Sequence, residues 1–175
     1  MIHKNNKKKI FFKKISKSDL ETLKKWRNLP EIFQFNTQYR LLNSIDQQNW
    51  YDSINKPESD RKMFIVKADD RIIGVCGLIH FDKKNKNADV ALIIGEIKFH
   101  GKGLGKEILR KLIEIGFKKF GLNRIGAEII VNNKKSEHVF QKLNFKFESK
   151  FREALWRNGR WYDINSYSVL KKEFR

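Results

Sequence analysis

The chain has 175 residues, of which 40% are hydrophobic and 13% are aromatic, and its formal net charge is +18. This length suits one domain with a buried core, and the hydrophobic content excludes a disordered chain. No apolar run reaches the roughly 20 residues that a membrane-spanning helix needs. The single cysteine, Cys76, excludes an internal disulfide and a cysteine-based zinc cluster.

The N-terminal stretch is basic, but it lacks the apolar run and the small-residue cleavage site of a secretion signal, so we expect a cytoplasmic protein. The positive charge has two interpretations: attraction to nucleic acid or another polyanion, or a composition that is simply rich in lysine. The lysines are scattered, and arginine, the better phosphate binder and base reader, is the minority cation. We therefore favour composition over nucleic-acid binding.

The first half of the chain predicts an antiparallel meander with two helices inserted after its first strand. Ser16 to Asp19 offer N-cap residues for the first helix, and Pro30 requires that it has ended. A turn at Asp69-Asp70 is typical of a hairpin. The expected elements are a strand at 10–15, helices at 19–27 and 44–54, and strands at 63–66, 71–80 and 89–94.

The second half predicts helices that alternate with strands, followed by a closing hairpin around Asn158-Gly159. A right-handed helical crossover would make the strand at 124–131 parallel to the strand at 89–94. The other expected elements are helices at 103–119 and 135–143 and strands at 145–151 and 161–170. Residues 1–175 therefore predict a single α+β domain, with a mixed, mostly antiparallel sheet and helices on both faces.

Gly101, Gly103 and Gly105 stand between a strand and the long helix at 103–119. They let the backbone turn sharply, and the helix start supplies unpaired N–H donors and the positive end of a dipole. With Lys102 and Lys106 nearby, this pattern predicts a phosphate or pyrophosphate cradle, although a tight turn without a ligand would give the same pattern. The spacing matches neither the nucleoside-triphosphate loop nor the dinucleotide fingerprint.

The stretch from His100 to Gly105 resembles the acyl-CoA signature [RQ]-x-x-G-x-[GA] of the GNAT superfamily of N-acetyltransferases, with His100 in place of the usual first residue. The resemblance covers nearly the whole chain. It is closest to the branch of ribosomal-protein alanine N-acetyltransferases, whose later motifs N-x-x-S and K-[LN]-x-F appear at 133–136 and 142–145. The short stretch Trp26-Arg27-Asn28 also looks like the start of acetyltransferases that modify a UDP-amino sugar on the pseudaminic acid pathway.

The resemblance implies acetyl-CoA as the acetyl donor, a primary amine as the acceptor and no metal. It places the pyrophosphate on the N–H groups of the glycine cradle and the pantetheine along the strand that ends at Ile94. The cofactor-binding residues that it implies are Leu92, Ile93, Ile94, His100, Gly101, Lys102, Gly103, Leu104, Gly105, Lys106 and Asn133.

Direct transfer needs a base for the amine, a donor for the oxyanion and a proton for the thiolate. Many GNAT enzymes supply that proton from a tyrosine, but Phe140 stands at its place here. The resemblance offers Ser136 instead, which could also be a helix-start residue that bonds its own backbone. Asp89 is the expected base and Glu153 the second choice, although a lone acid more often pairs with a lysine or arginine.

Two acceptor classes compete: the α-amine of a protein N-terminus and the amine of a small metabolite such as a nucleotide-linked amino sugar. Trp26, Arg27 and Tyr39 are the expected acceptor-binding residues, although packing explains most aromatics in the irregular stretch that follows the first helix. His80 and His138 are further proton carriers, and we favour neither. A non-catalytic nucleic-acid- or ribosome-binding module is the alternative of another class. The assembly that we consider is a homodimer.

Overall fold

The structure, a computed structural model, describes residues 8–36 and 39–174. Most of the basic N-terminal stretch, in which we expected no export signal, lies outside this range. The strands within it are β1 (Ile10–Lys14), β2 (Lys62–Ala68), β3 (Arg71–Asp82), β4 (Asn87–Ile94), β5 (Arg124–Ile130), β6 (Lys146–Arg157) and β7 (Arg160–Leu170). The helices are α1 (Leu20–Asn28), α2 (Pro30–Phe33), α3 (Ser44–Ile54), α4 (Leu104–Lys118) and α5 (Lys134–Gln141), with 3-10 turns η1 (Lys17–Asp19) and η2 (Ile97–Phe99).

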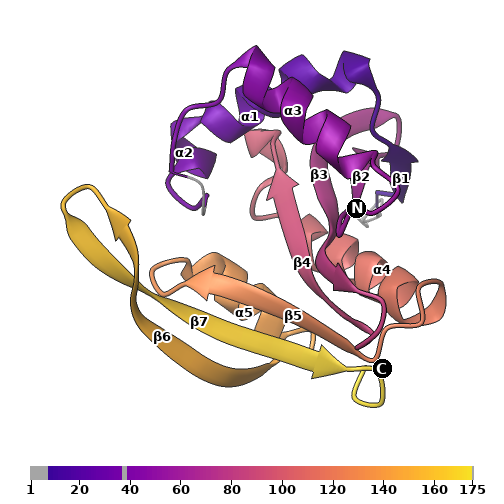
Figure 1. Cartoon of the computed structure of the whole chain (residues 1–175), viewed down its shortest axis with the longest axis vertical. Helices are drawn as coiled ribbons and strands as arrows, with labels where there is room; N and C mark the ends of the chain where they lie inside the picture. The colour runs from indigo at the N-terminus through magenta and orange to yellow at the C-terminus, as the bar shows by residue number, and fades with distance from the viewer. Residues whose placement is uncertain (1–7, 37–38, 175) are drawn as a thin grey trace, which may run out of the picture.

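The strands form one sheet in the order β1-β2-β3-β4-β5-β7-β6 (Figure 1). The pairs are antiparallel except for β4 and β5, which run parallel on either side of the α4 crossover. The predicted α+β class with a mixed, mostly antiparallel sheet is therefore confirmed. One local prediction was wrong: the stretch after α1 contains α2, because Pro30 suits the first position of a helix.

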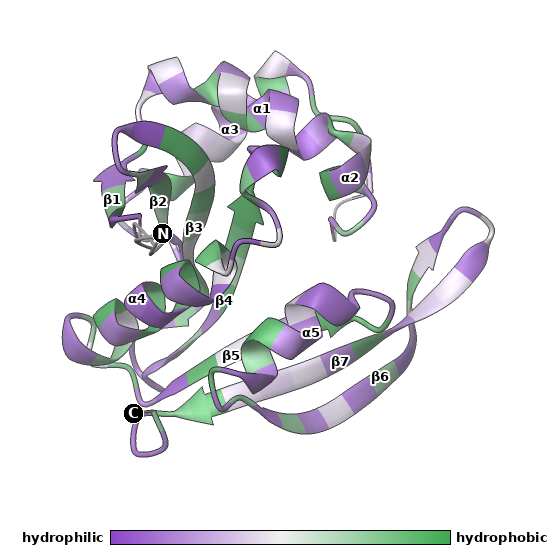
Figure 2. Ribbon diagram, turned by 180° about the vertical axis from the view of Figure 1, so that it is seen from behind, coloured by the Kyte–Doolittle hydropathy of each residue, from purple (hydrophilic) through white to green (hydrophobic). Residues whose placement is uncertain are grey.

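Helices cover both faces of the sheet, as Figure 2 shows. On one face, α4 packs on a large apolar cluster that includes Val66 and Cys76. On the other face, α1 and α3 pack on a smaller cluster that includes Ile65 and Val75. Neighbouring residues of one strand enter different clusters because successive side chains point to opposite faces. This alternation decides which side chains of β4 face α4 and which face α1 and α3.

The strands β4 and β5 separate soon after they begin. Their register pairs run only from Asn87–Arg124 to Asp89–Gly126, and the two strands then diverge (Figure 1). Beyond Asp89, β4 pairs only with β3, up to the pair of Gly74 with Ile94. The sheet therefore opens at Asp89, and the edge of β4 that faces β5 is left without strand partners beyond this point.

A buried arginine joins the closing hairpin to the other half of the molecule. Arg157, at the end of β6, is 4% exposed, and its guanidinium donates to the carbonyl oxygens of Gln34, at 2.7 Å, and of Asn36. It also lies 4.9 Å from the ring centre of Tyr39. The hairpin of β6 and β7 is thus tied to the segment that follows α2, on the far side of the divergence between β4 and β5.

Candidate active site

The open edge of β4 suits an extended molecule that carries amide groups. Leu92 and Ile93 pair with Cys76 and Val75 of β3. One edge of this part of β4 is therefore paired with β3, and the other edge has no strand partner. An unpaired strand edge offers alternating N–H and C=O groups to any extended partner. The pantetheine arm of coenzyme A has such amides, so this edge fits the cofactor. The ring of His100 lies 2.7 Å, through Nε2, from the carbonyl oxygen of Ile94.

The glycine cradle lies at the start of α4. Gly101 and Gly103 have φ angles of 71° and 76°, and a Cβ atom at either would meet nothing within 4 Å. The left-handed backbone, rather than crowding, therefore explains why these positions are glycine. Gly103 is the N-cap of α4, which leaves the N–H groups of the first turn for an anion. Leu104 is buried in the core, so only its backbone faces this site.

Several lysines surround the cradle. The ring of the buried Phe99 has the Nζ atoms of Lys8, Lys98 and Lys102 at 5.9, 5.7 and 5.8 Å from its centre. Lys106 lies in the first turn of α4. Lys102 and Lys106 add to the helix dipole and favour a polyphosphate at this end of β4, whereas Lys8 and Lys98 also pair with Asp69 and Glu96, at 2.9 and 3.2 Å. Sequence reasoning named Lys102 and Lys106 and missed Lys98 and Lys8, the second of which is distant in sequence.

The first turn of α5 carries the asparagine motif. The Oδ1 atom of Asn133 accepts a hydrogen bond from the backbone N–H of Ser136 at 3.2 Å and caps the helix. Ser136 is half-buried in that turn. Phe140 is buried and packs edge-on against Phe145, with ring centres 5.0 Å apart. It belongs to the core, which explains why this position carries no tyrosine hydroxyl.

Asp89 lies at the point where β4 and β5 part. Its carboxylate Oδ2 is 2.9 Å from Nδ1 of His80, and its side chain is 34% exposed. The neighbour across the last β4–β5 pair is Gly126, where a Cβ atom would lie only 2.2 Å from Oδ1 of Asp89. The carboxylate therefore occupies the space that the missing side chain leaves. His80 has a φ of 51° at an irregularity of β3, which turns its ring toward this carboxylate.

An ionised Asp89 can only accept a hydrogen bond, so Nδ1 of His80 carries the proton of this contact. In the neutral imidazole this contact puts the lone pair on Nε2, which is the form in which a histidine can take a proton from an amine. Ala88 and Val90 both point into the α4 cluster, so Asp89 faces the side of α1 and α3. Sequence reasoning considered both residues but gave no reason to pair them.

The second acid that the sequence suggested lies elsewhere. Glu153 is exposed on β6, and its backbone N–H donates to Oδ1 of Asp163 at 2.9 Å. Two strands, β5 and β7, lie between β6 and β4 in the sheet. Glu153 is therefore not brought together with Asp89. His138 is an exposed residue of α5.

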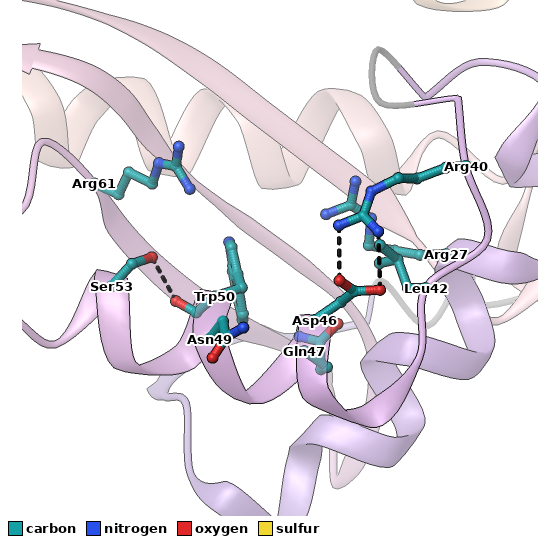
Figure 3. A pocket seen from close by; sticks show the side chains of 9 residues that line it. All are labelled: Arg27, Arg40, Leu42, Asp46, Gln47, Asn49, Trp50, Ser53 and Arg61. Atoms are coloured by element: carbon teal, nitrogen blue, oxygen red, sulfur yellow. Dashed lines mark hydrogen bonds and ion pairs between the residues drawn. The ribbon is translucent and has the colours of Figure 1, made fainter.

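A cavity of about 230 Å³ lies between α1, α3 and the start of β2 (Figure 3). Arg27, which sequence reasoning proposed as an acceptor-binding residue, lines it together with Arg40 and Arg61, which sequence reasoning did not single out. Asp46 receives two hydrogen bonds from Arg40, at 2.7 and 3.1 Å. The remaining lining residues are Leu42, Gln47, Asn49, Trp50 and Ser53.

The other two expected acceptor-binding residues have packing roles in the structure. Trp26 is buried in the cluster beneath α1, and a Cβ atom on Gly95 would lie 1.9 Å from its ring. Tyr39 stacks on Phe33, with ring centres 4.5 Å apart, and its hydroxyl accepts from Asn158 at 2.8 Å. Neither is among the residues that line the cavity of Arg27.

In the described part of the chain, no three His, Cys, Asp or Glu residues gather in a way that could hold a metal ion. None of the helices in residues 8–36 and 39–174 has both the length and the apolarity for a membrane crossing.

Comparison with known proteins identifies the family. The model of the acetyltransferase (GNAT) domain matches residues 9–146. A putative ribosomal N-acetyltransferase of Bacillus subtilis, YdaF, is 35% identical over 106 residues, which are 61% of this chain and 57% of that protein. The acetyltransferase PseH of Campylobacter jejuni is 28% identical over 137 residues, or 77% and 81% of the two chains.

Solved structures agree with this result at the level of the fold. The crystal structure of spermidine N-acetyltransferase from Vibrio cholerae, in complex with CoA and spermine, superimposes with a TM-score of 0.87. It covers 94% of this chain and 96% of its own, at 19% sequence identity. From the matched domain, the cradle and the open strand edge, we conclude that this chain belongs to the GNAT acetyltransferase family and is an acetyl-CoA-dependent N-acetyltransferase.

Proposed function

We propose that the enzyme acetylates a primary amine by direct transfer at the point where β4 and β5 part, with Asp89 and His80 as the basic pair. The observation that carries this assignment is the 2.9 Å contact between their side chains, next to the open edge of β4. The cradle and the pair lie at opposite ends of β4. Ile94 lies five positions after Asp89 along the strand, which corresponds to roughly 17 Å.

In this assignment Nε2 of His80 takes the proton that the attacking amine must lose. Asp89 holds the imidazole in the tautomer that leaves Nε2 free to accept it, and its negative charge stabilises the imidazolium that results. Bound acetyl-CoA supplies the activated acetyl group. His80 has a 66% exposed side chain, so the proton can pass on to water. This differs from our expectation that Asp89 acts as the base itself.

For the remaining two requirements we assign the open edge of β4 and the start of α5. Backbone N–H groups at an unpaired edge are fixed donors, which suits them to stabilise a developing oxyanion. Ser136 is the proposed source of the proton for the thiolate, because the tyrosine position is filled by the buried Phe140. The N-terminal cap by Asn133 fixes the turn on which Ser136 lies.

Two acceptor classes remain in the proposal. The relationship to a putative ribosomal N-acetyltransferase supports a protein N-terminal α-amine. The arginine-lined cavity between α1, α3 and β2 supports the amine of a nucleotide-linked amino sugar as the acceptor. The Asp89–His80 pair and the cradle support either enzyme over the nucleic-acid-binding module that the charge of +18 suggested.

The test is a mass-shift assay with acetyl-CoA against a panel of amines: an N-terminal alanine peptide, spermidine, an amino sugar and its nucleotide-linked form. The proposal expects an acetyl mass increment on one of these with efficient turnover. Hydrolysis of acetyl-CoA with no acetylated amine, or no binding of CoA at all, would refute it.

We further propose that residues 1–175 form a single acyltransferase domain in the cytoplasm and that it acts as a homodimer. Support for cytoplasmic residence comes from Cys76, a buried free thiol. Support for a dimer comes from the β6–β7 hairpin, where β6 is the sheet edge and four large apolar side chains are about half exposed: Phe147, Phe151, Trp156 and Trp161. Light scattering of the purified protein, with Trp156→Ser and Trp161→Ser variants, tests the dimer; a monomeric wild type would exclude it.

A further inference from the structure

The cavity between α1, α3 and β2 has an unusual charge balance. Its lining holds three guanidinium groups, those of Arg27, Arg40 and Arg61, against one carboxylate, that of Asp46, so positive groups outnumber negative ones on the lining. The guanidinium groups come from three segments that are far apart in sequence, and the fold brings them around one space (Figure 3).

Asp46 is engaged by Arg40 in a bidentate pair, and its second role is to cap α3 through the backbone N–H of Asn43. Arg61 has a more distant and exposed acid, Asp60, at 3.6 Å. Burial, followed by the charges of Arg61 and Arg40, lowers the pKa of Arg27. The like charges therefore act on one another across the cavity.

From this clustering we propose that the cavity binds a phosphate or diphosphate group of the amine acceptor, so that the substrate is a phosphorylated amine such as a nucleotide-linked amino sugar. The inference rests on the proposed function, because it names the acceptor of that reaction. Arginine is the side chain best matched to phosphate, since its planar fork donates two parallel hydrogen bonds. A diphosphate would also balance the excess charge.

The position of the cavity relative to the basic pair supports this assignment. Arg61 directly precedes Lys62, which pairs with Leu78 of β3, and the next residue of β3, Ile79, pairs with Asp89. Arg61 and Asp89 therefore flank β3 at the same level, about two strand spacings or roughly 10 Å apart.

Both side chains also belong to the same face of the sheet. Met63 and Ile65 pack beneath α1 and α3, and Arg61 precedes Met63 by two positions, so it shares their face. Asp89 points to this face as well, because its neighbours point to α4. A small molecule could therefore place its phosphate in the cavity and its amine at His80.

The same charges disfavour the other acceptors. Spermidine is a polycation, and the predominantly positive lining of the cavity would repel it. A protein N-terminus carries no anionic group at a constant distance from its α-amine that could bind the three arginines. The diphosphate of coenzyme A has its own cradle on α4, which packs on the opposite face of the sheet. The cavity therefore fits the second substrate.

The experiment is calorimetry on the full chain with CoA present at saturation, so that the cradle is occupied. Inorganic pyrophosphate, UDP and spermidine are titrated into the wild type, Arg61→Gln and the charge-matched control Arg71→Gln, which changes an exposed residue at the start of β3. We expect UDP and pyrophosphate to bind the wild type and the control, about tenfold or more weaker binding to Arg61→Gln, and no heat with spermidine. Arg40→Gln repeats the test at another arginine of the cavity lining.

Equal binding of UDP to the wild type and Arg61→Gln, no binding to the wild type, or tighter binding of spermidine than of UDP would overturn the inference. A phosphate of the acceptor is then distinguished from a free regulatory phosphate by kinetics on whichever amine turns over. Pyrophosphate that raises the KM of the amine at constant kcat supports the acceptor site. A change in kcat at constant KM contradicts it.

This design separates the two proposals. CoA binding and acetyl transfer test the proposed function, whereas the difference between Arg61→Gln and Arg71→Gln in binding of UDP tests the cavity. A protein that acetylates an N-terminal peptide and does not bind UDP keeps the proposed function and loses the inference. A protein that binds UDP through Arg61 but transfers no acetyl group shows the reverse.

Discussion

The imidazole of His80 and the carboxylate of Asp89 meet at 2.9 Å where the parallel strands β4 and β5 separate. This contact joins a residue at an irregularity of β3 to the last position of β4 that pairs with β5. In the proposed function this contact provides an oriented proton acceptor on the face of the sheet that lies opposite α4. The chemistry proposed for this protein depends on that contact and on the space around it.

The first prediction concerns the space that Asp89 occupies. In Gly126→Ala the new Cβ atom would lie 2.2 Å from Oδ1 of Asp89, so the carboxylate must rotate away and the contact with His80 is lost. We expect kcat to fall about 100-fold, as for a small misplacement of a catalytic group, while affinity for CoA stays the same. Steady-state kinetics with CoA calorimetry measure both. Glu128→Ala, an exposed change on the same strand, should keep wild-type kcat; equal kcat in the two variants would contradict the role of this space.

The second prediction concerns the cradle. Gly103→Val forces a β-branched residue into a φ of 76° and places it where the pyrophosphate would approach the backbone. We expect CoA binding to weaken at least tenfold. Gly159 has a similar φ of 74° in the β6–β7 turn, with equally open surroundings.

Gly159→Val is therefore the matched control for backbone strain. It should cost about 1–2 kcal/mol in the free energy of unfolding and leave CoA affinity as in the wild type. Calorimetric titration and chemical denaturation give the two numbers. If both variants lose CoA affinity equally, strain alone explains the effect and the cradle assignment fails.

The third prediction is a dependence of stability on pH. Asp19 is 5% exposed; burial raises its pKa, but donations from Lys13 and Ser16 outweigh this, and the pKa lies below the ordinary value. A lowered pKa in the folded state stabilises the protein above the unfolded-state pKa of about 4, and this stability is lost as the pH falls through the folded-state pKa. Asp19→Asn should therefore cost about 1–3 kcal/mol at pH 7 and progressively less in acid. Urea denaturation across pH measures the difference, and a cost that is constant from pH 7 down to pH 2 would contradict it.

The fourth prediction concerns the tie between the hairpin and the segment after α2. Arg157→Met removes the hydrogen-bond donors to the carbonyl oxygens of Gln34 and Asn36, so both oxygens lose this partner. We expect a cost of about 1–3 kcal/mol and faster amide hydrogen exchange at residues 34–36. Arg152→Met, an exposed change on the same strand, serves as the control. Unchanged exchange in Arg157→Met would show that the two halves are held together by other contacts.

Local patterns predicted most of the fold. The apolar stripe of α4, the capping residues around Ser16 and the turn at Asn158-Gly159 each depend on neighbours in sequence, and all three appear in the structure. The glycine turn at the start of α4 was also visible in the sequence, because its glycines and lysines are adjacent. The short helix α2 was missed because four residues carry too little periodicity to stand out from a loop.

The contacts on which the proposed base and the proposed acceptor site depend could not be predicted from neighbours in sequence. His80 meets Asp89 because an irregularity in β3 changes the direction of its side chain, and alternation along the strand does not reveal such a change. The cavity brings together Arg27 from α1, Arg40 from the segment between α2 and α3, and Arg61 from the position before β2. Sequence reasoning proposed Trp26 and Tyr39 as acceptor-binding residues because they are aromatic and near Arg27. In the structure, Trp26 packs in the cluster beneath α1 and Tyr39 packs on Phe33.

The most direct test of the account is the pH dependence of kcat/KM for acetyl transfer in the wild type and in His80→Gln, with His138→Gln as the control on an exposed histidine. The account predicts that His80→Gln loses about 10²- to 10⁴-fold in kcat/KM for the amine, together with the limb of the profile that rises as the base loses its proton. The control should follow the wild type. A His80→Gln enzyme with the wild-type rate and profile would contradict the assignment of the base and, with it, the proposed site of transfer.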